Sequence, residues 1–240
     1  QTQTFHSVPA GGEWLDTNAT NASTAAALQC GWTYYLAVRA TNCAGLEHVV
    51  ASLAGAKVCC SAPSVGAVVA LDAQGESVSH VSNASALRAS WSGFAEPCSG
   101  LRSYLLRLVS VATGDEVWSG RVNSSLSTAS VPASVMLTLE HEASYRLDVT
   151  ATSHAGIVSD VASATVTCDL TPPSVVGVSD GAGRSESDLS CVNAFAVFGC
   201  SWAAADDETS GIRMLEWALG SLPLASDLQP FVHISTSVTS

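Results

Sequence analysis

Two segments of the chain carry the same alternation of apolar and polar positions. The first reads YYLAVRATNCAGL over residues 34–46, and the second reads YRLDVTATSHAGI over residues 145–157. In each, apolar residues recur at every second position and are followed by a short Ala-Gly turn, which is typical of a half-buried strand that opens a hairpin. The pattern predicts hairpins with strands over 34–42 and 49–59, and over 145–153 and 158–167.

These segments belong to a longer internal repeat. The separation between Tyr34 and Tyr145 along the chain is the same as that between Trp91 and Trp202, each of which precedes a Ser-Gly-Leu/Ile-Arg segment. A unit of roughly 110 residues is too long for a solenoid repeat and has the size of a small domain. The sequence therefore predicts an array of similar domains.

The rest of the chain favours an all-β fold. Short runs rich in Val, Leu, Thr and Ser are punctuated by Gly, Pro, Asn and Asp, as in β-sandwiches. We place the C-terminal part of a first sandwich repeat at residues 1–61 and a complete repeat at 62–169. The N-terminal part of a third repeat follows at 170–240.

The charge balance argues against two classes of partner. The net charge is −12, and Lys57 is the single lysine. A basic groove for phosphates is absent, so we expect no nucleic-acid partner. A polybasic patch is absent as well, and no apolar run approaches the ~18 residues of a membrane span, so we expect no direct membrane insertion in this segment.

The cysteines and glycosylation sequons indicate an oxidising compartment. The chain has eight cysteines, an even number, together with four Asn-x-Ser/Thr tripeptides. This combination is typical of extracellular or cell-surface proteins, and we expect N-linked glycans on at least one site. The four candidate asparagines are Asn18, Asn21, Asn83 and Asn123.

Four sequence features recur or stand at the repeat boundary: a strand Trp, the following Ser-Gly-Leu/Ile, the Tyr-to-Ala-Gly segments, and the motif Asp169-Leu-Thr-Pro-Pro173 with Asp180-Gly181 after it. Taken together, these motifs resemble an extracellular fibronectin type III-like repeat, a seven-strand Ig-like β-sandwich. The first boundary, Cys60-Ser-Ala-Pro63, departs from the Thr-Pro-Pro form of the family, and the cysteines are additions. The Ala-rich, Lys-poor composition is similar to that of flagellar-surface or cell-wall glycoproteins of green algae, including mastigoneme subunits.

The resemblance implies where several cysteines lie. In such a sandwich the strands labelled F and G form a hairpin, so Cys30 at the start of F lies beside Cys59 and Cys60 at the end of G. Cys98 falls in the loop between strands B and C of the complete repeat, beside the exit from the first repeat. We therefore expect one bridge from Cys30 to the Cys59/Cys60 pair and another from that pair to Cys98.

The remaining cysteines are less determined. Cys191 and Cys200 flank a segment of eight residues, and we expect a bridge between them. Cys43 would face a partner in the missing part of the first repeat, and Cys168 has no clear partner. The alternative for all eight is buried free thiols, against which an extracellular setting argues.

The second junction carries acidic residues where the first has Cys98. Asp206, Asp207 and Glu208 fall near the exit residue Asp169. Clustered carboxylates would suit Ca²⁺, which takes about six to eight oxygen ligands. The alternative, which we favour, is a solvated acidic loop.

No catalytic fingerprint is present in the sequence. Nucleophile-elbow, P-loop and Rossmann motifs are absent, and the histidines and cysteines do not have zinc-ligand spacing. The acid pairs Glu140/Glu142 and Asp206/Asp207 fall in loops or at strand edges, which favours surface charge over glycosidase chemistry. We expect no enzymatic activity and no cofactor.

Two functions from different classes are consistent with these features. The first is a structural extracellular glycoprotein whose tandem repeats build a filament or stalk by head-to-tail and lateral association with copies of itself or related repeat proteins. The alternative is an adhesion or receptor ectodomain that binds a separate protein or glycan. A third, weaker hypothesis is an accessory module of an enzyme.

Overall fold

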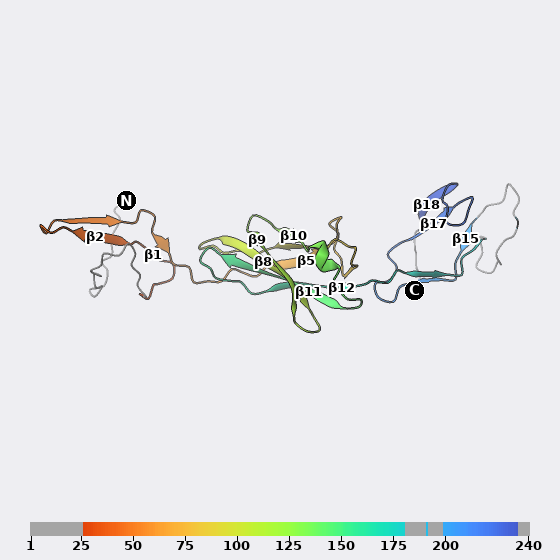
Figure 1. Cartoon of the computed structure of the whole chain (residues 1–240), viewed down its shortest axis with the longest axis horizontal. Helices are drawn as coiled ribbons and strands as arrows, with labels where there is room; N and C mark the ends of the chain where they lie inside the picture. The colour runs from red at the N-terminus through yellow and green to blue at the C-terminus, as the bar shows by residue number, and fades with distance from the viewer. Residues whose placement is uncertain (1–25, 181–190, 192–198, 235–240) are drawn as a thin grey trace. The chain divides into compact units, whose positions relative to one another are not determined.

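The computed structural model describes residues 26–180, 191 and 199–234 of the 240-residue chain. The chain divides into two compact units, Gln1–Cys60 and Ser61–Ser240 (Figure 1). Within the described residues, the secondary structure consists of eighteen short strands and one four-residue helix. The predicted all-β fold class is confirmed.

Residues of the predicted complete repeat form a two-layer sandwich. One sheet has three strands in the order β10-β7-β5, and the other has five in the order β6-β12-β11-β8-β9. Neighbouring strands are antiparallel, except that the two-residue β6 runs parallel to β12. Without β6, three strands face four, as in a fibronectin type III-like sandwich. The bounds are β5 Ala67–Leu71, β6 His80–Val81, β7 Arg88–Ser92, β8 Leu101–Ser110, β9 Glu116–Asn123, β10 Thr128–Ser130, β11 Ser144–Ser153 and β12 Ala162–Cys168.

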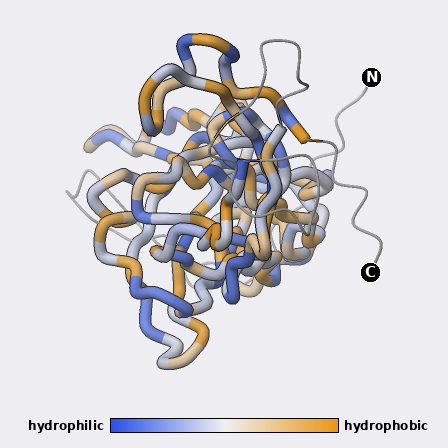
Figure 2. The backbone as a smooth tube through the Cα atoms, turned by 90° about the vertical axis from the view of Figure 1, so that its right-hand side faces the viewer, coloured by the Kyte–Doolittle hydropathy of each residue, from blue (hydrophilic) through white to orange (hydrophobic). Residues whose placement is uncertain are grey.

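Alternating residues of these strands fill the space between the sheets. Leu147, Val149 and Ala151 of β11 are buried, and so are Leu106 and Leu108 of the neighbouring β8. Hydrophobic and hydrophilic residues alternate along much of the chain (Figure 2), because successive side chains of a strand point to opposite faces of its sheet. The period-two pattern in the sequence therefore identifies the core side of the strands.

One aromatic pair anchors the centre of this core. The rings of Trp91 on β7 and Tyr104 on β8 lie with their centroids 5.1 Å apart and their planes tilted by 58°. Phe94 packs edge-on against the same tyrosine at 5.5 Å. The prediction that Trp91 is a core residue is confirmed.

A tyrosine fixes the entry into β11 and into its counterpart in the first repeat. The hydroxyl of Tyr145 accepts a hydrogen bond of 2.9 Å from the Glu140 backbone N–H, in the connection that follows α1 (Ala133–Met136). The Tyr34 hydroxyl accepts the same 2.9 Å bond from the Gln29 backbone N–H. Gln29 and Tyr34 precede Glu140 and Tyr145 by one repeat along the chain, so the same hydrogen bond occurs at equivalent positions. This arrangement is the tyrosine corner of Ig-like sandwiches.

The described part of the first unit contains four short strands. β1 (Thr33–Tyr34) pairs with β4 (Ala56–Lys57), and β2 (Ala37–Thr41) pairs with β3 (Glu47–Ala51), both antiparallel. The predicted hairpin is confirmed, although each of its long strands is interrupted and becomes two short strands.

The Ala-Gly turn has one geometry in both hairpins. Asn42 Oδ1 accepts hydrogen bonds of 2.9 Å from the N–H groups of Ala44 and Leu46, and Ser153 Oγ accepts one of 3.1 Å from the N–H of Ile157. The glycines have φ values of 79° at Gly45 and 82° at Gly156. Residues with a side chain rarely adopt such angles, which explains the glycine in the repeated motif.

The last strands of the second unit form three two-stranded pieces. β13 (Ser174–Val176) pairs with β16 (Ala204–Asp206), and β14 (Ser179–Asp180) pairs with β15 (Cys200–Ser201). The remaining hairpin, blue in Figure 1, joins β17 (Leu215–Leu219) to β18 (Gln229–Ile234). Among the described residues, none of these strands is part of either sandwich sheet.

The cysteines follow the predicted pairings only in part. Cys30 is joined to Cys60, with their Cα atoms 5.7 Å apart, which is one of the two pairings expected for Cys30. Cys59 and Cys98 are each part of a disulfide as well.

The bridge expected between Cys191 and Cys200 is not formed, because both residues are free thiols. Cys200 begins β15, where its cross-strand partner is Asp180. Closeness in sequence was therefore a poor guide to this pairing. Cys43 is an exposed free thiol, whereas the free thiol of Cys168 is fully buried in the sandwich core.

No helix in the described ranges has the length and apolar character needed to cross a membrane.

Candidate functional site

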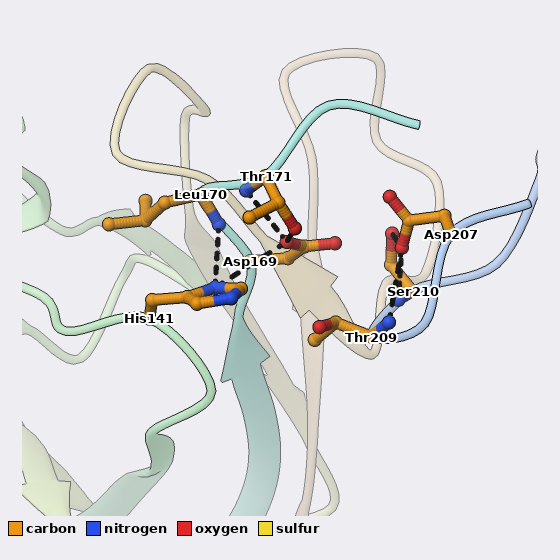
Figure 3. Close-up of polar contacts among 7 residues, drawn as sticks. All are labelled: His141, Asp169, Leu170, Thr171, Asp207, Thr209 and Ser210. Carbon is orange, nitrogen blue, oxygen red and sulfur yellow. Dashed lines mark hydrogen bonds and ion pairs between the residues drawn. The ribbon is translucent and has the colours of Figure 1, made fainter. Parts of the chain in front are cut away.

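The linker that leaves the complete repeat is organised by one carboxylate. Asp169 directly follows β12, and its backbone N–H donates to the Val81 carbonyl at 2.8 Å. Its Oδ1 accepts hydrogen bonds from the Thr171 N–H at 3.0 Å and from the Thr171 hydroxyl at 2.9 Å (Figure 3). A short acid followed two residues later by such a donor forms a local turn, which fixes the direction in which the chain leaves the sandwich.

A histidine supports the same linker from the side. His141 lies in the connection between α1 and β11, and its Nδ1 accepts a 3.2 Å hydrogen bond from the Leu170 N–H. The same nitrogen lies 3.6 Å from Asp169 Oδ1. The first two linker residues are thus in contact with a loop of the complete repeat.

The acidic segment after β16 contributes a second carboxylate with a turn-forming role. Asp207 Oδ1 accepts hydrogen bonds from the Thr209 N–H at 3.2 Å, the Ser210 N–H at 2.8 Å and the Ser210 hydroxyl at 3.2 Å. Figure 3 shows Asp207 turned toward these residues. The Asp207 carboxylate therefore caps the loop that contains it.

The complete repeat has an equivalent carboxylate-capped loop, one repeat earlier in the chain. Glu96 occupies the position of Asp207 and accepts hydrogen bonds from the N–H groups of Cys98, Ser99 and Gly100. These bonds, with that of the Ser99 N–H the largest, lower the pKa of the buried Glu96 carboxyl despite the opposing effect of its burial. An acid followed by Ser-Gly is therefore a loop-capping signal in both repeats. The sequence contains this signal, but we interpreted Asp207 as a solvated charge, with a calcium ligand and a glycosidase carboxylate as the weaker alternatives.

Ser210 connects the linker to the capped loop. Its hydroxyl has the largest effect on the nearby Asp169 carboxyl and, together with the hydrogen bonds from Thr171, lowers the pKa of that carboxyl to about 2. The proton of this hydroxyl is donated to Asp207 Oδ1, so both acids lie near one serine. The polar side chains of the linker and of the following loop are thereby close neighbours.

An open hollow of about 280 Å³ lies beside these side chains. Acidic and hydroxyl side chains make up most of its lining. The residues that line it are His141, Glu142, Thr171, Pro172, Ser174, Asp206, Asp207, Glu208 and Thr209.

The described residues do not support a calcium site at this junction. Over residues 26–180, 191 and 199–234, no three or more His, Cys, Asp or Glu side chains are grouped so that they could hold a metal ion. Asp206 Oδ1 accepts the Asp207 N–H at 2.9 Å, and Asp207 closes its turn. These oxygens of Asp206 and Asp207 therefore accept hydrogen bonds from backbone N–H groups of the same loop.

A second polar cluster lies on the outer face of the five-stranded sheet. Asp148 is buried and accepts hydrogen bonds from Arg146 Nε at 2.6 Å and Ser163 Oγ at 2.6 Å, with Arg107 at 4.0 Å. Burial raises the pKa of Asp148, but the hydrogen bonds from Arg146 and Ser163 and the charges of Arg146 and Arg107 bring it below its ordinary value. The cluster ties β8, β11 and β12 together.

Two of the four predicted glycosylation sites can be placed. Asn83 is exposed in the turn after β6, and Asn123 is exposed at the end of β9. Asn18 and Asn21 lie outside the described residues. Occupancy of all four sites stays a prediction.

The chain is similar to solved structures at low sequence identity. No family model matches it, and no curated protein matches it. Among solved structures, domains d3–d4 of the rat CD45 extracellular region match with a TM-score of 0.35 and 12% identity, over 70% of this chain and 80% of that one. The chicken CNTN1 FN1–FN3 domains match with a TM-score of 0.35 and 11% identity, over 82% of this chain, which spans 62% of theirs. The fibronectin type III-like assignment therefore rests on the strand order and tyrosine corners described above.

Proposed function

We propose that this chain is a structural segment of an extracellular glycoprotein whose tandem β-sandwich repeats build a filament or stalk. The observation that carries the proposal is the closeness of the Asp169–Thr171 turn at the exit of one repeat to the loop that Asp207 caps, with Ser210 as the residue that influences both acids. A mechanical spacer needs linkers of defined direction, and the Asp169–Thr171 turn with the His141 contact to Leu170 favours one.

The extracellular location is proposed on separate grounds. The bridge between Cys30 and Cys60 would be maintained in an oxidising compartment, and Asn83 and Asn123 are accessible to glycosylation. The composition favours the surface of an algal flagellum, with a mastigoneme subunit as the finer form of the proposal.

The partners in this proposal are copies of the same chain or of related repeat proteins. Head-to-tail contacts between like repeats generate open filaments when the rotation between subunits does not close a ring. Exposed sheet edges provide sites for lateral association.

Electron microscopy and analytical ultracentrifugation of the purified chain test this proposal. We expect concentration-dependent assembly into fibres with a regular axial repeat. A chain that remains a monodisperse monomer at high concentration would contradict it.

A second candidate is an adhesion or receptor ectodomain, which the hollow beside the junction favours. The acidic and hydroxyl groups that line this hollow suit hydrogen bonding to a glycan or a basic peptide. Titration with glycan libraries and basic peptides would separate the candidates, because an ectodomain of this kind binds its ligand as a monomer.

A further inference from the structure

The outer face of the five-stranded sheet carries most of the basic residues of the complete repeat. Residues 62–169 contain ten acidic residues, five arginines and no lysine. Three of these arginines, Arg107, Arg121 and Arg146, lie on three adjacent strands, β8, β9 and β11, and alternate with residues that face the core. Positive charge is therefore gathered on one face of an otherwise acidic repeat.

The strand pairing places the three arginines along one diagonal of the sheet. Arg146 lies opposite Val109 and Arg121 lies opposite Leu105, two residues to either side of Arg107 on β8. Diagonal neighbours on one face of a sheet are about 7–8 Å apart. The three positions therefore form a line across three strands, which we call the arginine stripe.

One buried acid holds the arginine stripe in place but neutralises only part of its charge. Asp148 accepts two hydrogen bonds from Arg146, at 2.6 and 3.0 Å, and lies 4.0 Å from Arg107 Nη2. Arg121 donates only to the Ser103 hydroxyl, at 2.9 Å, among the interactions of the described residues. Glu116, opposite Val109 at the start of β9, is a second acid on this face, so the cations still outnumber the acids.

The guanidinium groups of the arginine stripe are accessible to a ligand. The side chains of Arg107 and Arg146 are 34% and 45% exposed, and Arg121 is exposed as well. The stripe is also specific to this repeat, because the positions one repeat away from Arg107 and Arg146 are the uncharged Ala218 and Tyr35. The sandwich pattern itself therefore does not require these charges.

We propose that the arginine stripe binds an acidic polysaccharide. A guanidinium group can donate two parallel hydrogen bonds to one oxyanion, and a line of three such groups fits a linear polymer with repeated carboxylate or sulfate groups. Exposed hydroxyls lie beside the stripe, with Ser119 opposite Arg107 and Thr165 opposite Arg146. These hydroxyls can exchange hydrogen bonds with the sugar rings.

The other side chains of this face favour a polysaccharide over a protein partner. Protein interfaces are centred on aromatic and apolar anchors. The aromatic residues of these three strands, Tyr104, Trp118 and Tyr145, pack against the core instead. Of the outward apolar residues on β8, Leu105 is half-buried and Val109 is buried. The inference goes beyond the proposed function, because this binding does not require the chain to assemble.

Biolayer interferometry of the whole chain on immobilised polysaccharides tests the inference. Dextran sulfate and polygalacturonate are the acidic probes, and neutral dextran is the control polymer. We expect binding to an acidic probe that weakens as salt is added, and no binding to dextran.

Two double variants locate the binding site. Arg107→Gln with Arg121→Gln should weaken binding to the acidic probe by at least about tenfold. Lys57→Gln with Arg88→Gln removes the same charge elsewhere, from the first unit and from the other sheet, and should bind like wild type. Arg121→Gln alone, at an exposed residue without an ion pair in the described ranges, should weaken binding with the least effect on the fold.

Thermal melting checks that each variant is folded. Failure of the wild-type chain to bind either acidic probe would overturn the inference, and so would equal binding by the two double variants or equal binding to neutral dextran. Sedimentation velocity of the chain without polysaccharide separates the remaining case. If the stripe variant loses self-association but keeps its polysaccharide affinity, the face is a protein contact and the inference is overturned, while the filament proposal stands.

Discussion

Single side chains that accept hydrogen bonds hold the loops of this protein. Glu96, Asp207 and Asn42 each close a turn through nearby backbone N–H groups. Tyr145 does the same over a longer distance, because its hydroxyl reaches the Glu140 N–H across the connection after α1. At the residue scale, polar side chains are therefore structural.

Replacing Tyr145 by phenylalanine tests this conclusion directly. The Glu140 N–H would lose its partner in a largely buried setting, so we expect the free energy of unfolding of the complete repeat to fall by about 1–2 kcal/mol. Chemical denaturation monitored by tryptophan fluorescence measures the change. Tyr35→Phe, at an exposed residue, is the control, and an equal loss in both variants would contradict the proposed role.

The lowered pKa of Asp169 predicts that the stability of the folded chain depends on pH. Its folded-state pKa of about 2 lies below the value of about 3.9 in an unfolded chain, so its contribution to stability is fully present above pH 4. That contribution is lost as the pH falls through 2. Asp169→Asn should therefore lower the melting temperature at pH 7, and the difference from wild type should shrink toward pH 2.

Melting curves between pH 2 and 7 measure this difference, with Asp160→Asn at an exposed site as the control. A difference between Asp169→Asn and wild type that stays constant across this range would show that the carboxylate charge is not responsible.

At the scale of elements, the repeated hairpin turn makes the clearest prediction. Gly156 has a φ of 82°, and a Cβ added there would meet nothing within 4 Å, so only backbone strain opposes a side chain. Gly156→Ala should destabilise the complete repeat by about 1–2 kcal/mol. Gly156→Asn should cost less, because asparagine tolerates this conformation better. Equal losses measured by chemical denaturation would contradict this explanation.

The cysteines give a prediction about covalent connections between elements. Peptide mapping under non-reducing conditions should recover Cys30 linked to Cys60, while Cys191 and Cys200 should react with an alkylating reagent before reduction. A peptide pair containing Cys191 and Cys200 joined to each other would contradict the structure.

The hairpins and the sandwich were predictable because strand periodicity and turn glycines are local signals. The alternation in residues 145–153 identified β11, and the matched spacing identified its counterpart in the first repeat. The interruption at Tyr35–Leu36, helix α1 and the tyrosine corner depend on contacts between distant segments, which periodicity does not contain. The free Cys191 and Cys200 were missed for the same reason, since their pairing was judged from sequence distance alone.

At the scale of the whole molecule, apolar positions that match by the repeat spacing differ in exposure among the described strands. Apolar positions that are buried in the complete repeat are exposed in β2 and partly exposed in β17. Apolar strand faces of this kind favour association. Under the proposed function, we expect assembly to reduce the exposure of such strands.

Hydrogen–deuterium exchange of the whole chain, below and above its assembly concentration, tests this account most directly. Amides of β8 and β11 should be protected at both concentrations, because their sandwich is complete. Amides of β2 and β17 should exchange fast in the dilute chain and become protected on assembly. Protection of β2 and β17 that does not change with concentration would contradict the account, and so would rapid exchange of β8 and β11.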